Sequence, residues 1–314
     1  LTTDVFYTKD INGAHVQNWG LSNPTGTLGG VDNRPIYNDA DKGNNAYVFT
    51  NSNKGRTLNL TFKGQKTFDN GLYVMAAYNY LDSQDVNSIE AEITGDAFDF
   101  NPILSNANNA TLANSRYGDN HRFIGVASKS WSYGSNKKWS TTVSSFYELA
   151  KGGRFNYTYA GDINNDGSNL NDLIYIPTTS EISQMQFGNT NDASNLDNFI
   201  KQDAYLKGRR GQYAERYAAL APWRAKMDVK FIQNLKLKNN NSLEFSIDVL
   251  NFGNLLNSDW GLVQQPDAVQ PIGVTVAANG TPTYSFNSGL KETFVYNSSL
   301  ISRWQMQFGL RYSF

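Results

Sequence analysis

The residues best suited to chemistry are those of the segment DINNDG, which begins at Asp162. Asp162, Asn164 and Asp166 match the first three ligand positions of an EF-hand calcium loop, and the glycine that follows takes the sixth position, where the chain turns sharply. The twelfth position is Leu173 instead of Glu, and Asp172 stands one residue short, so the closing bidentate ligand is out of register. We therefore expect a polar turn without an ion, and keep these three residues as the one candidate site for a structural calcium.

Charged side chains recur at every second position near the end of the chain. Between Trp223 and Phe231 the odd positions are apolar and the even positions are charged, and between Ser242 and Val249 apolar odd positions alternate with Ser, Glu, Ser and Asp. Successive side chains of a strand point to opposite faces, so the charges share one face. Such a face suits a wide, wet lumen, and we predict that it contains Arg224, Lys226, Asp228, Lys230, Glu244, Asp248, Arg303 and Arg311.

Catalytic residues are sparse. The chain has two histidines, His15 and His121, and no cysteine, and Asp119 is the one carboxylate that stands close to either histidine in the sequence. A hydrolase needs a nucleophile beside a base that a third group orients. A lone His at the end of a strand is more often a solvated residue, so we predict no enzymatic activity.

The elements that position these residues are best seen in the last thirteen residues, SRWQMQFGLRYSF. Every second residue from Trp304 to Phe314 is apolar or aromatic, and the residues between them are polar or Gly. Ten steps of ~3.3 Å, tilted by ~45°, rise about 23 Å, close to the height of the lipid-facing band of an outer-membrane barrel. The pattern is typical of the strand that ends such a barrel.

The rest of the chain repeats this kind of strand, with short and long connections in alternation. Short turns are expected at 69–71, 133–136 and 238–240, and their Asn and Gly residues suit positive φ. Short periplasmic turns and long external loops alternate in the same way in outer-membrane barrels. The predicted strands are Leu1–Thr8, Ala46–Phe68, Leu72–Ser83, His121–Ser132, Lys138–Tyr159, Pro222–Leu237, Ser242–Asn254 and Ser302–Phe314.

Composition excludes several other classes. The 314 residues include 18 Phe, 18 Tyr and 6 Trp, and the net charge is -1. The mean hydropathy is -0.51, and no run of ~18 apolar residues predicts a transmembrane helix. Neither the net charge nor any basic run indicates a nucleic-acid partner. A barrel has a low mean hydropathy because only alternate residues meet lipid.

Four segments carry a more specific pattern: GDINNDGSNLNDLIYIP from Gly161, RRGQYAERYAALAPWRAKMDVKF from Arg209, LEFSIDVLNFGNLLNSDWG from Leu243, and the terminal RWQMQFGLRYSF. Together they resemble the C-terminal barrel portion of TonB-dependent receptors, in particular the Oar-like branch. Members of that family have a 22-stranded barrel, an N-terminal plug and a short segment that contacts TonB.

The resemblance implies an all-β chain, residues 1–314, that supplies the last eight strands of a transmembrane antiparallel β-barrel. It implies an active importer of a large solute in the Gram-negative outer membrane, with membrane lipid, the rest of the barrel and plug, and TonB as partners. Whether a surface lipoprotein is a further partner cannot be read from the sequence. Residue 1 lies in a predicted strand, so we expect a longer chain whose upstream part holds the plug. The transported solute cannot be read from the loops.

Two other folds share the pattern. A closed eight-stranded barrel would act as a membrane anchor or binding protein without a pore, but its narrow interior has little room for so many charges. A soluble β-sandwich alternates in the same way, yet its strands average ~5 to 6 residues, which is shorter than those expected here.

Two finer features are predictable. Apolar residues at spacings of three and four between Asn195 and Ala219 predict one or two short helices in the third long loop. In the last hairpin, the numbers of paired residues should have an even sum, because an odd sum would turn one apolar set away from lipid. A three-residue turn at 238–240 makes this sum 478, whereas the alternative sum of 474 would place Leu237 in the turn. This register places Lys230 opposite Asp248, and Val229 opposite Val249.

Overall fold

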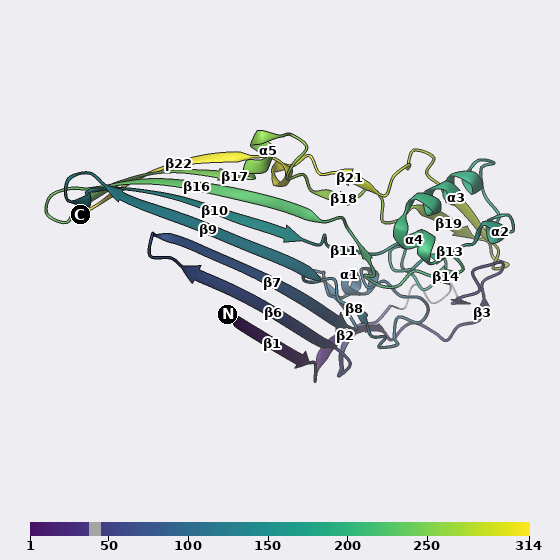
Figure 1. The fold of residues 1–314 in the computed structure, drawn as a ribbon. Helices are drawn as coiled ribbons and strands as arrows, with labels where there is room; N and C mark the ends of the chain where they lie inside the picture. The colour runs from purple at the N-terminus through teal and green to yellow at the C-terminus, as the bar shows by residue number, and fades with distance from the viewer. Residues whose placement is uncertain (38–44) are drawn as a thin grey trace.

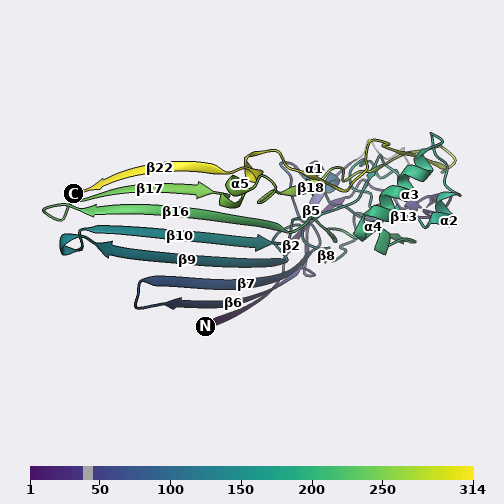
Figure 2. The same cartoon turned by 45° about the horizontal axis from the view of Figure 1, so that its top comes forward.

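The computed structural model describes residues 1–37 and 45–314. Eight long strands run side by side in one antiparallel sheet, in the order β1-β6-β7-β9-β10-β16-β17-β22 (Figures 1 and 2). Each long strand pairs with the long strands nearest to it in the chain, as in a meander. The strands are β1 (Thr2–Lys9), β6 (Arg56–Thr67), β7 (Leu72–Asp85), β9 (His121–Tyr133), β10 (Trp139–Ala150), β16 (Arg224–Lys236), β17 (Ser242–Leu250) and β22 (Gln305–Ser313).

The sheet is open. In the described residues, β1 pairs only with β6, and β22 pairs only with β17. The expected antiparallel sheet is therefore present without closure, and these eight strands do not form the closed small barrel that we considered. Each edge strand keeps one row of backbone N–H and C=O groups without a strand partner.

Alternation divides the sheet into two different faces. Aromatic and aliphatic side chains gather on one face, and many of them are exposed; Phe308, for example, is 64% exposed, and Leu310 is 75% exposed. Four more exposed side chains lie on the same face: Phe123, Trp131, Met227 and Phe245. The opposite face carries most of the Ser, Thr, Asn and charged residues of the sheet, together with some apolar ones such as Val126, Phe146 and Ile232. An apolar face of this size, left uncovered, marks a surface that meets another apolar phase.

The predicted register of the last hairpin is confirmed. Val229 pairs with Val249, and Lys230 pairs with Asp248. Leu237 N–H donates to the Asn241 carbonyl oxygen at 2.8 Å and closes the turn. Asn239 and Asn240 take φ values of 57° and 63° there, a conformation that Asn tolerates better than most residues.

Several strand boundaries differ from our prediction. The expected strand Ala46–Phe68 is two strands, β5 (Tyr47–Ser52) and β6, because the chain turns at Asn53–Gly55. The strand expected at Lys138–Tyr159 is β10, which ends at Ala150, and a Cβ at Gly152 would lie 2.5 Å from the Pro222 carbonyl oxygen. The next-to-last strand ends at Leu250, because Asn251 adopts a left-handed conformation with φ 51°.

The terminal strand also begins later than expected. Ser302 belongs to the short helix η3 (Leu300–Ser302), and β22 begins at Gln305. At the other end of the sheet, η2 (Ser135–Lys137) forms the turn between β9 and β10. No helix in the described residues is long and apolar enough to cross a membrane.

The long connections fold into a lobe at the end of the sheet opposite the short turns (Figures 1 and 2). The predicted helices are confirmed as α3 (Asp192–Gln202) and α4 (Ala204–Gly208), and Asp203 caps α4 by accepting the Leu206 N–H at 2.7 Å. The other elements are β2 (Gly13–Asn18), β3 (Gly26–Thr27), β4 (Pro35–Ile36), α1 (Thr94–Asp99), β8 (Ala113–Asn114), β11 (Arg154–Phe155), β12 (Tyr159–Ala160), β13 (Tyr175–Ile176), α2 (Thr179–Ile182), β14 (Gln212–Tyr213), β15 (Ala219–Leu220), α5 (Phe252–Leu256), β18 (Gln264–Pro266), β19 (Ile272–Val276), β20 (Pro282–Phe286) and β21 (Phe294–Tyr296).

The lobe has its own hydrophobic core. Tyr159, Ile176, Phe199 and Tyr284 are buried in one cluster although they come from distant parts of the chain. Burial of apolar side chains contributes ~1.5 to 3 kcal/mol each, so these contacts hold the loops as a folded unit. The lobe is the largest difference from the plain external loops that the sequence suggested.

Candidate functional site

The charged face of the sheet is the first candidate site. The strand registers place seven of the eight predicted lumen-facing residues on it, in opposed pairs such as Lys230 with Asp248 and Glu244 with Arg311. Lys230 Nζ lies 2.9 Å from Asp248 Oδ1. The Arg311 and Glu244 side chains approach to 4.0 Å. Exposed pairs of this kind contribute ~0.2 to 1 kcal/mol to the stability of the sheet, so their main effect is to favour this strand register over others.

Arg303 is the exception among the predicted lumen-facing residues. It lies between η3 and β22, outside any strand, and its side chain donates to the Ser298 carbonyl oxygen at 3.1 Å. The sequence pattern missed this because alternation continues for two residues beyond the point where β22 begins to pair. Arg303 therefore belongs to the lobe end of the sheet.

Two further ion pairs anchor this face where it meets the lobe. Arg224, at the start of β16, binds Asp119 in the loop before β9 at 2.8 Å. Arg122 binds Glu148 on the neighbouring strand at 2.6 Å. Asp228 accepts the Asn251 N–H at 2.7 Å and so holds the chain where it leaves β17. Some of the predicted lumen charges thus have a structural role.

The predicted calcium residues form a tight, buried loop. Asp162 Oδ1 and Asn164 Oδ1 both accept the Asp166 N–H, at 3.0 and 2.9 Å, and Asp162 Oδ2 accepts the Gly167 N–H at 2.9 Å. Asp166 in turn accepts the Ser168 N–H at 3.0 Å. In the part of the chain that the structure describes, no three His, Cys, Asp or Glu side chains are placed to hold a metal ion. Carboxylates alone therefore do not make a metal site here.

A buried arginine stands beside this loop. The Arg34 guanidinium binds Asp32 at 2.9 Å and Asp172 at 2.9 Å, and it donates to the Leu173 carbonyl oxygen at 2.6 Å. The Tyr159 hydroxyl donates to Asp32 at 3.2 Å and completes the network. Desolvation opposes the charge on Arg34, but the two carboxylates outweigh it and raise the pKa of the guanidinium.

Burial disfavours the charged form of several carboxylates in and near residues 162–172, which we call the acidic loop. Desolvation, with a further contribution from the charge of Asp162, raises the pKa of Asp166 to about 7. Burial also raises the pKa of Asp172 well above its ordinary value, although Arg34 opposes this shift. Burial also raises the pKa of Asp99 at the end of α1, and the nearby charge of Asp162 adds to this shift. Several carboxylates therefore lie where charge is costly.

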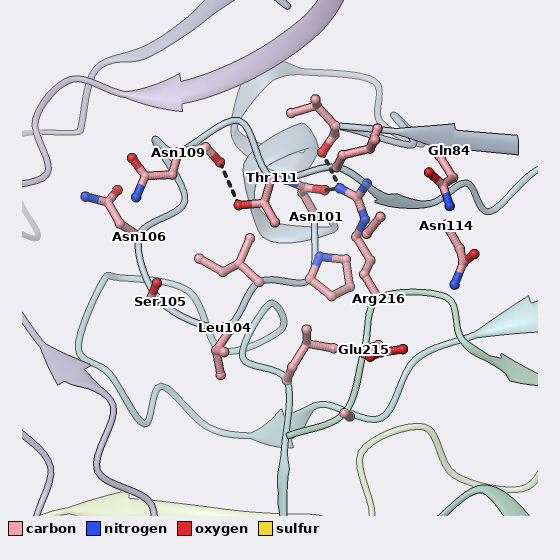
Figure 3. A pocket seen from close by; sticks show the side chains of 17 residues that line it. Gln84, Asn101, Leu104, Ser105, Asn106, Asn109, Thr111, Asn114, Glu215 and Arg216 are labelled. Atoms are coloured by element: carbon pink, nitrogen blue, oxygen red, sulfur yellow. Dashed lines mark hydrogen bonds between the residues drawn. The ribbon is translucent and has the colours of Figure 1, made fainter. Parts of the chain in front are cut away.

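A pocket with a volume of about 550 Å³ lies between the end of β7, the segment 101–114 and the segment 214–216. Figure 3 shows Asn106 and Asn109 on one side of it and Gln84 and Asn114 on the other, with apolar side chains between them. Arg216 lies in its wall and binds Asp85 at 2.9 Å and Asn101 at 2.8 Å. Side-chain amides both donate and accept hydrogen bonds, so this part of the pocket can bind polar groups of a solute.

The histidines do not form a catalytic arrangement with Asp119. His121 Nδ1 lies 2.8 Å from the Tyr78 hydroxyl, while Asp119 binds Arg224. His15 lies buried in β2, where its Nε2 hydrogen-bonds the Ala107 carbonyl oxygen at 3.2 Å. Burial lowers the pKa of His15 and favours the neutral ring.

Sequence patterns did not reveal the Arg34 network or the pocket. Arg34 and Asp172 are 138 residues apart, and neither stands in a periodic segment. The one available signal was that Asp172 follows the DINNDG loop closely. Comparisons with protein-family models, with curated proteins and with solved structures found no match to this chain.

Proposed function

We propose that this chain forms part of the wall and the external loops of a TonB-dependent outer-membrane importer of a large solute. The single observation that carries the proposal is the two-faced sheet, apolar and exposed on one side and charged on the other, with all its short turns at one end. The bilayer is the apolar phase that the exposed side chains would meet.

The open edges support a larger barrel. A lone eight-stranded barrel would pair its first strand with its last, and its interior would be filled by side chains. In this sheet β1 and β22 remain unpaired with each other, and the polar face holds opposed charges that suit a wet lumen. Further strands, up to the 22 of the resembled family, would close the wall around a plug.

The other parts of the proposal follow from the resemblance and from the lobe. TonB would act on a segment upstream of these residues and rearrange the plug, and the lobe would lie outside the cell, where a surface lipoprotein could cover it. The amide-lined pocket offers a first contact for the solute. We propose a Gram-negative outer-membrane location and no enzymatic step.

A cysteine scan of the full-length protein in intact cells tests the topology, since this chain contains no cysteine of its own. Ser180→Cys, in the lobe, should react at once with a membrane-impermeant maleimide, whereas Asn239→Cys, in a short turn, should react only after the outer membrane is opened. Phe308→Cys should resist this reagent in both conditions. Reaction of Asn239→Cys in intact cells would contradict the proposed orientation.

A second measurement separates an importer from a passive anchor. The full-length protein should bind the purified periplasmic domain of TonB, and solute uptake should stop in cells that lack TonB while the protein stays in the outer membrane. A protein that is fully membrane-inserted but never binds TonB would favour the anchor instead.

A further inference from the structure

The acidic loop, residues 162–172, is buried to a degree that polar side chains rarely reach. Asn164, Asn171 and Asp172 are each 0% exposed, and Asp166 is 3% exposed. Buried polar groups require partners, because an unpaired one loses its hydration without compensation. The question for each oxygen of this loop is therefore which donor or cation it contacts.

The negative charge of Asp166 has no cation partner among the residues that the structure describes. Its carboxylate accepts hydrogen bonds from the Ser168 backbone and from the amides of Asn164 and Asn171. The neighbouring cation, Arg34, is already bound to Asp32 and Asp172. Hydrogen bonds alone leave a buried charge, and a buried charge normally pairs with a cation or coordinates a metal.

One buried oxygen points independently to a missing ligand. Within residues 1–37 and 45–314, Asn171 Oδ1 has no hydrogen-bond partner, and neither does the hydroxyl of the buried Tyr37. The nitrogen of this amide faces the acidic side chain, because Asn171 Nδ2 lies 3.3 Å from Asp166 Oδ2, and the unpaired oxygen is the other end of the same amide. Tyr37 lies against the same loop, because its N–H donates to the Asn164 carbonyl oxygen at 2.8 Å.

The spacing fits a cation. A half-turn of the Asn171 amide, whose two ends have nearly equal size, would place its oxygen where the nitrogen now lies, 3.3 Å from Asp166 Oδ2. Two oxygens at that separation, each ~2.4 Å from one ion, subtend about 87° at the ion, within the range of about 72° to 90° between neighbouring ligands of a pentagonal bipyramid, a common calcium geometry.

We propose that residues 162–172 bind one calcium ion through the carboxylates of Asp162 and Asp166 and the amide oxygens of Asn164 and Asn171. Asn171 then takes the closing role that the sequence pattern seemed to lack, while Asp172 holds Arg34. All four ligands are oxygens, and neither histidine nor cysteine is involved, so calcium fits better than zinc. Calcium also accepts amide oxygens and irregular geometry more readily than magnesium. The site does not depend on the proposed import function.

The affinity should be modest. The site has two carboxylates and no bidentate glutamate. We therefore expect an affinity like that of extracellular calcium modules, whose dissociation constants are ~10⁻⁴ to 10⁻³ M. The test is calorimetric titration of the full-length, chelator-treated protein with calcium chloride, with terbium luminescence as a second readout. Tyrosine transfers excitation to bound terbium, and Tyr37 lies against the loop. We expect binding of one ion.

Three variants make the titration decisive. Asp166→Asn should weaken calcium binding at least tenfold, and Asn171→Asp should strengthen it, because it adds a charged ligand at the closing position. Asp259→Asn removes an exposed carboxylate elsewhere in the lobe and should leave the affinity unchanged. Circular dichroism in chelator checks that each variant is folded.

Several results would overturn the site. They are no binding at 10 mM calcium, an Asp166→Asn protein that binds as the parent does, or an Asn171→Asp protein that binds no more tightly. An Asp166→Asn protein that fails to fold in chelator would also count against the proposal, since loss of an uncompensated buried charge should help the calcium-free loop. Failure of calcium binding would leave the cysteine-labelling and TonB tests untouched.

Discussion

The raised pKa of Asp166 makes a quantitative prediction about the stability of the lobe in the absence of calcium. The perturbation is Asp166→Asn, which keeps the size of the side chain and removes its charge. Burial, with help from Asp162, raises the pKa of Asp166 from its ordinary value of 3.8 to about 7 in the folded state. The folded lobe therefore binds a proton more tightly than the unfolded chain does.

The sign follows from that difference. Below pH ~4 Asp166 is protonated in both states and has no effect on the pH dependence of unfolding. As the pH rises from 4 to 7, the unfolded chain ionises first, and the lobe loses stability until the folded carboxyl also ionises. A difference of ~3 pKa units corresponds to about 4 kcal/mol of lost stability above pH 7.

The assay compares the two proteins between pH 4 and pH 8. Urea unfolding of the lobe, followed by intrinsic fluorescence in chelator, should give a free energy of unfolding for the parent that falls relative to Asp166→Asn by about 4 kcal/mol across this range. The Asn side chain also changes local hydrogen bonds, but this offset is constant with pH. Saturating calcium should abolish the relative slope, since the ion holds the carboxylate ionised.

Parallel pH profiles for the two proteins in chelator would refute this reasoning. They would mean that Asp166 ionises in the folded lobe as it does in water, and so that a cation or solvent reaches it. A profile in which the parent becomes more stable than Asp166→Asn as the pH rises would reverse the sign and equally refute it.

Three further outcomes are expected. Phe308→Arg should lower the amount of folded, heat-modifiable protein in the outer membrane, because a cation at mid-bilayer costs ~2 to 4 kcal/mol, whereas Gln307→Arg on the opposite face should leave that amount unchanged. Oxidation of the double variant Lys230→Cys, Asp248→Cys should form a disulfide within the hairpin, since the two positions pair directly; no cross-link would contradict the register. Arg34→Met should destabilise the lobe by about 3 to 5 kcal/mol by leaving buried carboxylates without a cation, which limited proteolysis at rising temperature would detect; an unchanged cleavage midpoint would show that the network is dispensable.

Much of the sheet was determined by the sequence itself. The two faces follow from alternation alone, because a strand has a period of two and each side chain must meet either an apolar or a polar phase. The last hairpin was predicted to the residue, since any one-residue slip would have moved Val229 and Val249 to different faces. The short turns were readable because Asn and Gly tolerate the positive φ that they require.

Only the tertiary structure decided how the long connections fold. Asn251 ends a strand where the pattern continued, because it takes a left-handed conformation and its N–H donates to Asp228. Gly152, which follows the end of β10, lies so close to the backbone of Pro222 that no Cβ would fit there. The core of the lobe joins residues that have no common periodicity, so no local pattern could indicate which of them pack together.

The acidic loop shows most clearly which features the sequence determined and which the tertiary structure decided. The sequence DINNDG indicated that Asp162, Asn164 and Asp166 could share one ion, because their spacing is a local property of the chain. It did not indicate that Asp172 would be taken by Arg34, 138 residues away, or that Asn171 would be left with an unpaired oxygen. Burial and charge compensation depend on which distant segments cover the loop, and the packing of the lobe decides that.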